Sequence, residues 1–275
     1  MIKIILKSRL DEIKDFVTER IMQHILSGQV NKFECHKLVN LMCLKWYNIS
    51  ELDSRPEVVT ICFSQEDLFF ICENENCAKR VKDIVKSDSS NDKILYWFFA
   101  NLIKDDISYL EEFEERVTET EDDLITTSKK ECAGIIISYR RELLILKKYY
   151  EQLNHIFEGL TDNENELISL EDLRYFKILD ARIDRLYAKV LNLRDYVTQV
   201  REAYQAQIDI EQNNIMKVFT VVTAIFLPLS LIAGWYGMNL KMPEYDWQYG
   251  YIFVIILSIL IVIASIIFFK FKKWF

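Results

Sequence analysis

The sequence predicts an α+β soluble domain that continues through a long stalk helix into two membrane-spanning helices. Two apolar runs of 23 residues, 218–240 and 247–269, contain no charged residue. A bilayer core of about 30 Å needs about 20 helical residues, so each run is long enough to cross it. Between 160 and 227 the chain has neither glycine nor proline, which is typical of long helices. The N-terminal part mixes strand and helix periods.

Residues 1–90 are predicted to form a small α/β domain. Strands are predicted at 1–7, 58–63 and 68–72, and an amphipathic helix is predicted from Asn74-Glu75 to about Val85. The cysteines contain no Cys-x-x-Cys pair and are predicted to be small buried hydrophobes in a reducing compartment. They are Cys35, Cys43, Cys62, Cys72, Cys77 and Cys132. The three histidines, His24, His36 and His155, are scattered over the soluble part and argue against a zinc site there.

Residues 91–168 are predicted to form an acidic helical hairpin. The stretch 111–123 holds eight acidic residues and one base, Arg116. A second helix is predicted near 131–157. Its basic residues are Arg140, Arg141, Lys147 and Lys148. We therefore expect an antiparallel pair with an acidic arm and a basic arm.

One helix is predicted over 169–236, beginning at the capping-box sequence Ser169-Leu170-Glu171-Asp172. At 1.5 Å per residue it is about 100 Å long, so only its last third fits in a bilayer and the rest forms a stalk. Apolar residues spaced three and four apart indicate a packing face on the stalk. They are Leu179, Ile183, Leu186, Val190, Leu193, Val197, Val200, Tyr204 and Ile208. A short external loop, 237–249, and a second span with a basic tail, 250–275, complete the chain.

Charge indicates how the chain is oriented. Residues before Met216 include 29 basic and 40 acidic side chains, a net charge of −11, so nucleic acid is not a predicted partner. Lysines flank the inner ends of both spans and the loop carries one lysine and two acids. The positive-inside rule then places both termini in the cytoplasm and the loop outside. The apolar run at 1–7 is too short for a secretory signal, and the inner cell membrane is the expected location.

The first span carries small and polar residues on one helix face. This face holds most of the small and polar residues of the span, and its members are spaced alternately three and four apart: Asn213, Met216, Thr220, Thr223, Leu227, Ser230, Gly234 and Gly237. This stripe has no charged residue or histidine. A fixed carboxylate in a narrow pore would hold a divalent ion too tightly for release, whereas amide oxygens can hold a hydrated ion. The stripe is therefore predicted to line a water-filled path, and close packing between helices is the alternative.

The stripe leads into Gly237-Met238-Asn239, which is followed by Glu244, the second span and the tail Lys272-Lys273-Trp274-Phe275. In this arrangement the segment 213–275 resembles the pore region of the CorA family of divalent-cation transport proteins. The resemblance implies a homopentamer whose first spans line the axis. It implies that Gly237, Met238 and Asn239 form the selectivity entrance, where Asn239 binds hydrated Mg²⁺. It also implies that the terminal lysines form a basic collar, with lipid-headgroup anchoring as the alternative.

The resemblance also implies a hydrophobic constriction at Met216, Phe219, Thr223 and Leu227. Thr223 departs from the family, in which this position is often apolar, so the gate is expected to be leakier or placed lower. Family members close when cytosolic Mg²⁺ binds between a stalk acid and an acid of the neighbouring subunit. The candidate stalk acids are Asp180 and Asp184, and the candidate partners are Glu51 and Asp53.

The sequence therefore predicts a passive magnesium channel, gated by cytosolic magnesium, whose partners are further copies of itself, the bilayer and divalent cations. A divalent ion gains about 4.6 kcal/mol in crossing a potential of about 100 mV, and the chain has no phosphate-binding loop to supply energy otherwise. No nucleophile, base and metal set indicates an enzyme, and no organic cofactor is predicted. Two alternatives stay open: a zinc, cobalt or nickel transporter of the same superfamily, and a membrane-anchored sensor or scaffold without transport.

Overall fold

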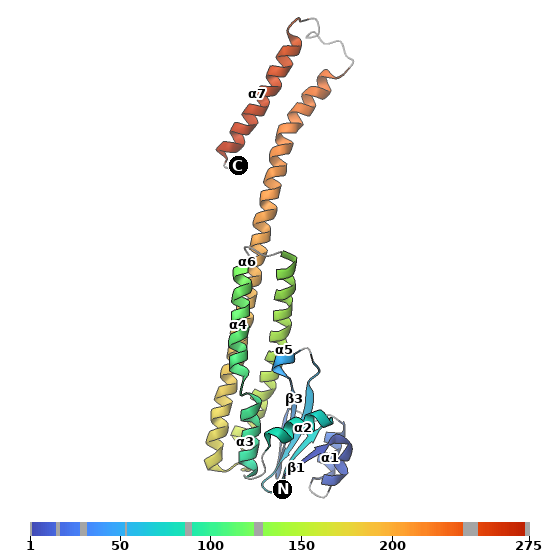
Figure 1. Ribbon diagram of the computed structural model, residues 1–275, viewed down its shortest axis with the longest axis vertical. Helices are drawn as coiled ribbons and strands as arrows, with labels where there is room; N and C mark the ends of the chain where they lie inside the picture. Colours follow the sequence, from blue (N-terminus) through green and yellow to red (C-terminus); the bar gives the residue numbers. More distant parts are fainter. Residues whose placement is uncertain are drawn as a thin grey trace. The chain divides into compact units, whose positions relative to one another are not determined.

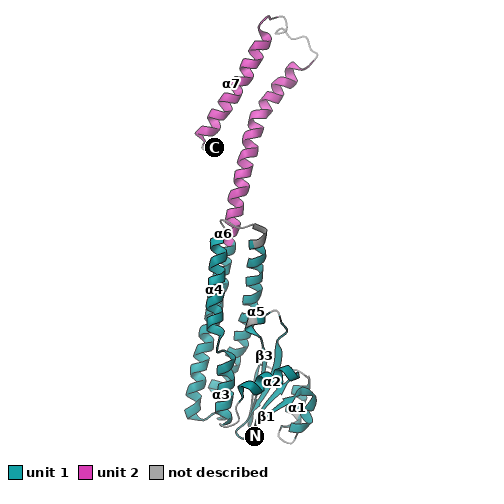
Figure 2. Ribbon diagram, in the orientation of Figure 1, with its two compact units in different colours: residues 1–201 teal, residues 202–275 magenta. Residues whose placement is uncertain are grey.

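The computed structural model describes residues 2–14, 17–27, 32–52, 54–85, 90–123, 129–238 and 247–272. The chain divides into two compact units, 1–201 and 202–275, coloured separately in Figure 2. The first unit contains a sheet and most of the helices. The second contains the last part of α6 (Leu170–Tyr236) together with α7 (Gly250–Phe271).

A five-stranded sheet forms the centre of the first unit, with strand order β1-β5-β4-β3-β2. The strands are β1 (Ile2–Leu6), β2 (Phe33–His36), β3 (Val39–Trp46), β4 (Glu57–Phe63) and β5 (Leu68–Cys72). β1 runs parallel to β5, and the other neighbours are antiparallel. Three of these strands coincide with the predicted ones, whereas the hairpin of β2 and β3 was not predicted.

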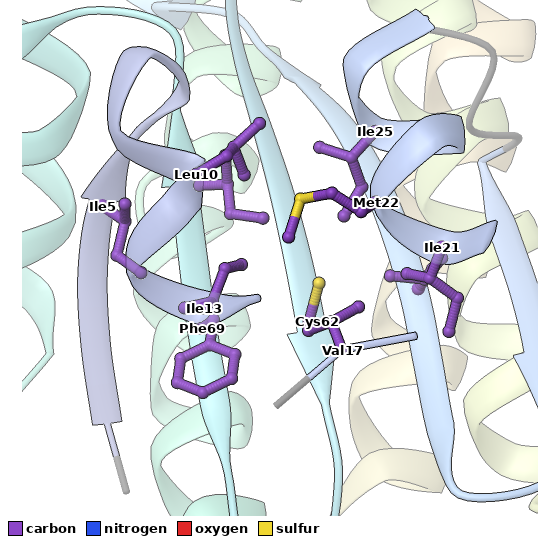
Figure 3. Packing of buried hydrophobic residues seen from close by; sticks show 11 residues of the cluster. Ile5, Leu10, Ile13, Val17, Ile21, Met22, Ile25, Cys62 and Phe69 are labelled. Atoms are coloured by element: carbon purple, nitrogen blue, oxygen red, sulfur yellow. The ribbon is translucent and has the colours of Figure 1, made fainter. Parts of the chain in front are cut away.

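One face of the sheet is covered by the N-terminal helices η1 (Lys7–Ile13) and α1 (Glu19–Ser27). Figure 3 shows their apolar side chains meeting Cys62 and Phe69 of the sheet. Because side chains alternate along a strand, Phe69 and Ile71 belong to this cluster while Phe70 points to the other face.

The second face packs against α2 (Glu75–Ile84), α3 (Asn91–Leu102) and α5 (Lys129–Asp162). The rings of Phe70 and Phe98 lie 5.0 Å apart between centroids. α2 begins where the sequence predicted, because the Asn74 side chain accepts a hydrogen bond from the Cys77 amide at 2.8 Å. On α5, Gly159 lies so close to β2 that a Cβ there would come within 2.2 Å of the Phe33 ring.

The helical hairpin consists of α4 (Asp106–Asp123) and α5. Side-chain contacts step in opposite directions along the two helices, from Tyr150 with Asp106 to Tyr139 with Thr120, so the pair is antiparallel. We expected acids of α4 to face bases of α5, but the ion pair between Arg116 and Glu142 has the opposite polarity. Arg116, the one base of the acidic stretch, donates to Glu142 of α5 at 2.9 Å.

The long helix α6 begins at the predicted cap, where the Ser169 hydroxyl accepts a hydrogen bond from the Asp172 amide at 3.2 Å. Its predicted packing stripe is fully buried as far as Val200, while Tyr204 and Ile208 are only partly buried. α6 runs beside α4 in Figure 1. Polar contacts between them include Lys189, which lies 2.6 Å from Glu114, and the Tyr196 hydroxyl, which donates to Glu121 at 2.6 Å.

All six cysteines are free thiols. Four of them are buried as predicted, and burial raises the pKa of Cys62 to about 12. The prediction is wrong for Cys35, which is exposed, and Cys43 is partly exposed. Cys35 lies on β2, the strand of the unpredicted hairpin that forms the edge of the sheet, so β2 pairs with a strand on one side only.

Candidate functional site

The predicted stripe lies on α6 in the second unit, and all of its described members are exposed. Its bulky apolar members are exposed to more than half of their area, Met216 by 62% and Leu227 by 70%, and so is Phe219 of the expected constriction, by 65%. The other members are Asn213, Thr220, Thr223, Ser230, Gly234 and Gly237. This face of the span carries both bulky apolar and hydrogen-bonding groups, and within a single chain it stays exposed.

A different face of α6 is covered within the second unit. Val221 is only 5% exposed, and Ala224, Pro228 and Ile232 are partly buried. These positions recur every three to four residues, so they form one face of the helix. The stripe is therefore not the surface that packs within the single chain, which argues against close intrachain helix packing as the reason for its small residues.

Two hydroxyl groups of the stripe are already used as donors. Thr220 donates to the carbonyl oxygen of Met216 and Thr223 donates to that of Phe219, each at 2.8 Å. Their remaining lone pairs can only accept hydrogen bonds. Acceptors suit a hydrated cation, because the water molecules around it direct their protons outward.

α6 ends directly before the Gly237-Met238-Asn239 motif. The Gly237 amide donates to the Ala233 carbonyl oxygen at 2.9 Å, and a Cβ on Gly237 would lie 2.9 Å from that same oxygen. Glycine suits this position because any side chain would crowd that carbonyl oxygen. Met238 is half exposed and its amide donates to the Trp235 carbonyl oxygen at 3.3 Å. Asn239, like Glu244, lies outside the described residues.

A cavity of about 450 Å³ lies beside this helix end, within the second unit. Its lining consists of Ala233, Tyr236, Gly237, Trp247, Gln248, Gly250, Tyr251 and Val254. Trp235, Trp247 and Tyr249 are exposed near the same ends of α6 and α7. Tryptophan and tyrosine gather where a membrane meets water. α6 and α7 are both long and apolar enough to cross a membrane.

The candidate regulatory acids lie in the first unit on α6. Asp180 is half-buried, and Asp184 one turn later is exposed. Burial raises the pKa of Asp180, and the negative charges of Asp184, Glu158 and Asp162 raise it further. The described parts of the chain hold no preformed group of three or more metal-ligating side chains.

Of the two candidate partner acids, Glu51 lies among the described residues. Glu51 lines a separate cavity of about 870 Å³ with side chains of α4 and α5, including Arg116 and Glu142. Asp53 lies outside the described residues. The structure of one chain therefore brings Asp180 together with Asp184, and leaves the pairing with Glu51 or Asp53 as a prediction about two chains.

One buried ionisable residue was not predicted. Asp106, the first residue of α4, is 2% exposed and accepts a hydrogen bond from the Tyr150 hydroxyl at 2.8 Å. From the sequence, an aspartate at a helix start is expected to be an exposed capping acid. Its burial becomes evident only in the structure, where three helices pack around it.

These observations define the class of the molecule. An α+β domain is followed by a long helix, α6, whose last part is apolar and carries an open polar stripe, and a second apolar helix, α7, comes after it. Residues 54–273 match the family described as CorA-like Mg²⁺ transporter protein. The chain belongs to this family, and the resemblance of the segment 213–275 is confirmed.

Known relatives agree with this assignment. The chain is 30% identical over 184 residues to the cobalt/magnesium transport protein CorA of Thermotoga maritima, covering 66% of this chain and 52% of that protein. It is 28% identical over 194 residues to the putative metal ion transporter YfjQ of Bacillus subtilis, covering 70% and 60%. This chain thus spans about half the length of the Thermotoga maritima protein.

Solved structures share the fold. The CorA magnesium transporter from Methanocaldococcus jannaschii superposes with a TM-score of 0.78 at 20% identity, covering 98% of this chain and 88% of that one. The full-length CmaX protein gives 0.73 at 14% identity, covering 98% and 84%. The ZntB cytoplasmic domain from Vibrio parahaemolyticus gives 0.59 at 16% identity, covering 73% and 82%. At these identities the likeness shows the fold alone.

Proposed function

We propose that this chain forms a passive channel for magnesium, with α6 lining the pore. The observation that carries the proposal is the open stripe of α6, which offers hydroxyl acceptors and leads into Gly237-Met238-Asn239. Membership of the CorA-like family supports it, as do relatives named for magnesium or cobalt transport. Two spans cannot enclose a pore, so several copies must assemble, and the family resemblance favours five.

In this assembly the ion keeps its water. Mg²⁺ gives up water reluctantly and prefers oxygen ligands, so a ring of Asn239 amide oxygens at the outer mouth binds it through its hydration shell. The ion then passes the constriction formed by Met216, Phe219, Thr223 and Leu227. The membrane potential drives the ion into the cell. The channel lies in the inner cell membrane, with both termini in the cytoplasm.

We further propose that cytosolic Mg²⁺ closes the channel at Asp180 and Asp184. Their mutual repulsion, together with that from Glu158 and Asp162, is the supporting observation. A divalent cation bound there between subunits would relieve the repulsion. Zinc, cobalt or nickel transport is the alternative within the class, and a sensor or scaffold without transport is the alternative outside it.

The test is flux through the purified protein in lipid vesicles, with Mg²⁺ and Zn²⁺ compared separately. The Asn239→Ala variant should assemble normally and lose most of the Mg²⁺ flux. Asn214→Ala is the matched control, because Asn214 is exposed on α6 but does not belong to the stripe. Cobalt hexammine, which exchanges its ligands slowly, should block from the outside.

Each alternative predicts a different result in this assay. Near-normal Mg²⁺ flux through assembled Asn239→Ala protein would remove the selectivity assignment. Saturable flux of Zn²⁺ but not of Mg²⁺ would favour the zinc transporter. Absence of any divalent flux through the intact oligomer would favour the sensor or scaffold.

A further inference from the structure

A buried carboxyl group lies where three helices of the first unit meet. Asp106 begins α4, is 2% exposed, and accepts a hydrogen bond from Tyr150 of α5 at 2.8 Å. Among the described residues, no lysine, arginine or histidine forms an ion pair with it. A buried carboxylate without an ion-pair partner is costly, so this group favours its neutral form.

The third helix holds the turn that precedes Asp106. Arg182 of α6 donates to the carbonyl oxygens of Ile103 and Lys104 at 3.0 and 3.1 Å. These carbonyls lie between the end of α3 and the start of α4. Arg182 is the connection between this turn and α6, the helix that also contains the stripe described above.

The charged and titratable groups around Asp106 come from every element packed on it. Arg182 of α6 attracts the ionised form, whereas Asp105, which precedes it and is exposed, repels it. From α5 come two buried phenols, Tyr150 and Tyr149, both of which feel the charge of Asp106. Burial is the largest effect and raises the pKa of Asp106 to about 7, although the Tyr150 hydrogen bond and Arg182 lower it.

We propose that Asp106 is a proton-controlled latch for the turn between α3 and α4. When Asp106 is neutral, the turn stays closed against α6. When Asp106 is ionised, the turn opens more often, because opening allows water to reach the charge. Acidification of the surrounding solution therefore tightens the hold of the turn on Arg182. This latch does not depend on the identity of the transported ion, or on transport at all.

Proton linkage gives the direction and the size of the pH effect on the opening of the turn. In the closed turn the pKa of Asp106 is about 7, and in an open, hydrated turn it returns toward the ordinary value of 3.8. The closed state binds more protons, so opening becomes more favourable as pH rises and levels off above about 7. Between pH 6 and pH 8 the opening equilibrium should increase about tenfold.

Hydrogen exchange on the full-length protein measures this opening directly. The amide of Tyr109, which donates to the Asp105 carbonyl oxygen at 3.1 Å, reports on the first turn of α4. After correction for the intrinsic exchange rate at each pH, its protection should fall about tenfold from pH 6 to pH 8. In Asp106→Asn the protection should be the same at both values.

Asp105→Asn is the matched control, since it removes the same charge from the neighbouring exposed position and should keep the pH dependence. Tyr150→Phe provides a second test if Asp106→Asn does not fold. It removes the hydrogen bond that lowers the pKa of Asp106, so the pH midpoint of opening should move upward. Equal protection of the wild type at pH 6 and pH 8 would overturn the proposal. So would an unchanged midpoint in Tyr150→Phe, or an unchanged pH dependence in folded Asp106→Asn.

Discussion

Gln152 of α5 pairs with the backbone of Lys45 on β3 in the way that a neighbouring strand would. Its Oε1 accepts from the Lys45 amide at 3.0 Å, and its Nε2 donates to the Lys45 carbonyl oxygen at 2.6 Å. The ladder between β2 and β3 ends at Met42, so this end of β3 has no strand beside it on that side. The Gln152 side chain, 5% exposed, thereby satisfies two backbone groups and joins the helical hairpin to the sheet.

Replacing Gln152 with leucine should lower the free energy of unfolding by about 2 to 4 kcal/mol, because a buried N–H and a buried C=O lose their partners. Chemical denaturation of the full-length protein measures this change. Gln23→Leu on the exposed side of α1 is the control and should shift the midpoint little. Equal stability of Gln152→Leu and the wild type would show that water replaces the amide without cost.

Two glycines of α5 should respond in opposite ways to alanine. A Cβ at Gly159 would come within 2.2 Å of the Phe33 ring, whereas a Cβ at Gly134 would meet nothing within 4 Å. Gly159→Ala should therefore destabilise the protein by about 1 to 3 kcal/mol through overpacking. Gly134→Ala should stabilise it by about 0.5 to 1 kcal/mol, because alanine is the better helix former.

The same denaturation experiment tests the pair, and a second-site change separates crowding from helix propensity. Phe33→Leu in the Gly159→Ala background should recover part of the lost stability, since it removes the atoms that the new methyl group meets. Recovery that is absent, in a protein that Phe33→Leu alone leaves folded, would assign the loss to another cause.

Local patterns in the sequence were sufficient for much of the fold. β5 is a continuous apolar run and β4 is rich in β-branched and apolar residues, and α2 and α6 start at the side-chain caps of Asn74 and Ser169. A cap acts over three or four residues, so a sequence displays it directly. The stripe on α6 was likewise predictable, because three-four spacing places residues on one helix face whatever surrounds the helix.

The hairpin of β2 and β3 was missed because long-range contacts decide it. Asn40 is a polar residue inside β3, yet it is 1% exposed and its side-chain oxygen accepts from Asn165 at 2.6 Å. That partner lies 125 residues away. The turn at Lys37 and Leu38 also lacks the glycine or asparagine that signals a tight hairpin. The burial of Asp106 was invisible for the same reason, since α5 and α6 create it.

Removal of the Thr223 hydroxyl should reduce flux if the proposed pore is correct. Thr223 offers an acceptor between Phe219 and Leu227, whose side chains are both more than half exposed. Thr223→Val makes this section entirely apolar, and apolar constrictions exclude water. Basal Mg²⁺ flux in vesicles should fall severalfold, while Thr223→Ser should stay near the wild-type value.

Ser258→Ala is the matched control for this substitution. Its hydroxyl donates to the Val254 carbonyl oxygen at 2.8 Å, so the variant loses the same kind of intrahelical bond on α7, away from the stripe. Flux should be unaffected. An undiminished flux in Thr223→Val, together with a loss in Asn239→Ala, would keep the channel and move the constriction elsewhere on α6.

Neutralising Asp180 and Asp184 should remove the response to cytosolic magnesium. In the wild type, burial and the charges of Asp184, Glu158 and Asp162 all raise the pKa of Asp180. Its ionised form therefore opposes folding as pH rises above the ordinary aspartate range, and a bound divalent cation should offset that effect most at neutral and alkaline pH. The Asp180→Asn/Asp184→Asn variant should be more protease-resistant than the wild type without Mg²⁺ and gain little when Mg²⁺ is added.

The measurement compares protease resistance and vesicle flux across a series of internal Mg²⁺ concentrations at pH 8. Asp195→Asn serves as the control, since Asp195 is an exposed acid of the same helix outside this group. The wild type and the control should both gain resistance and lose flux as Mg²⁺ rises, because the ion bridges carboxylates that otherwise repel. A double variant that still closes at the wild-type Mg²⁺ concentration would show that Asp180 and Asp184 are ordinary surface charges, and would direct the search to acids contributed by α4.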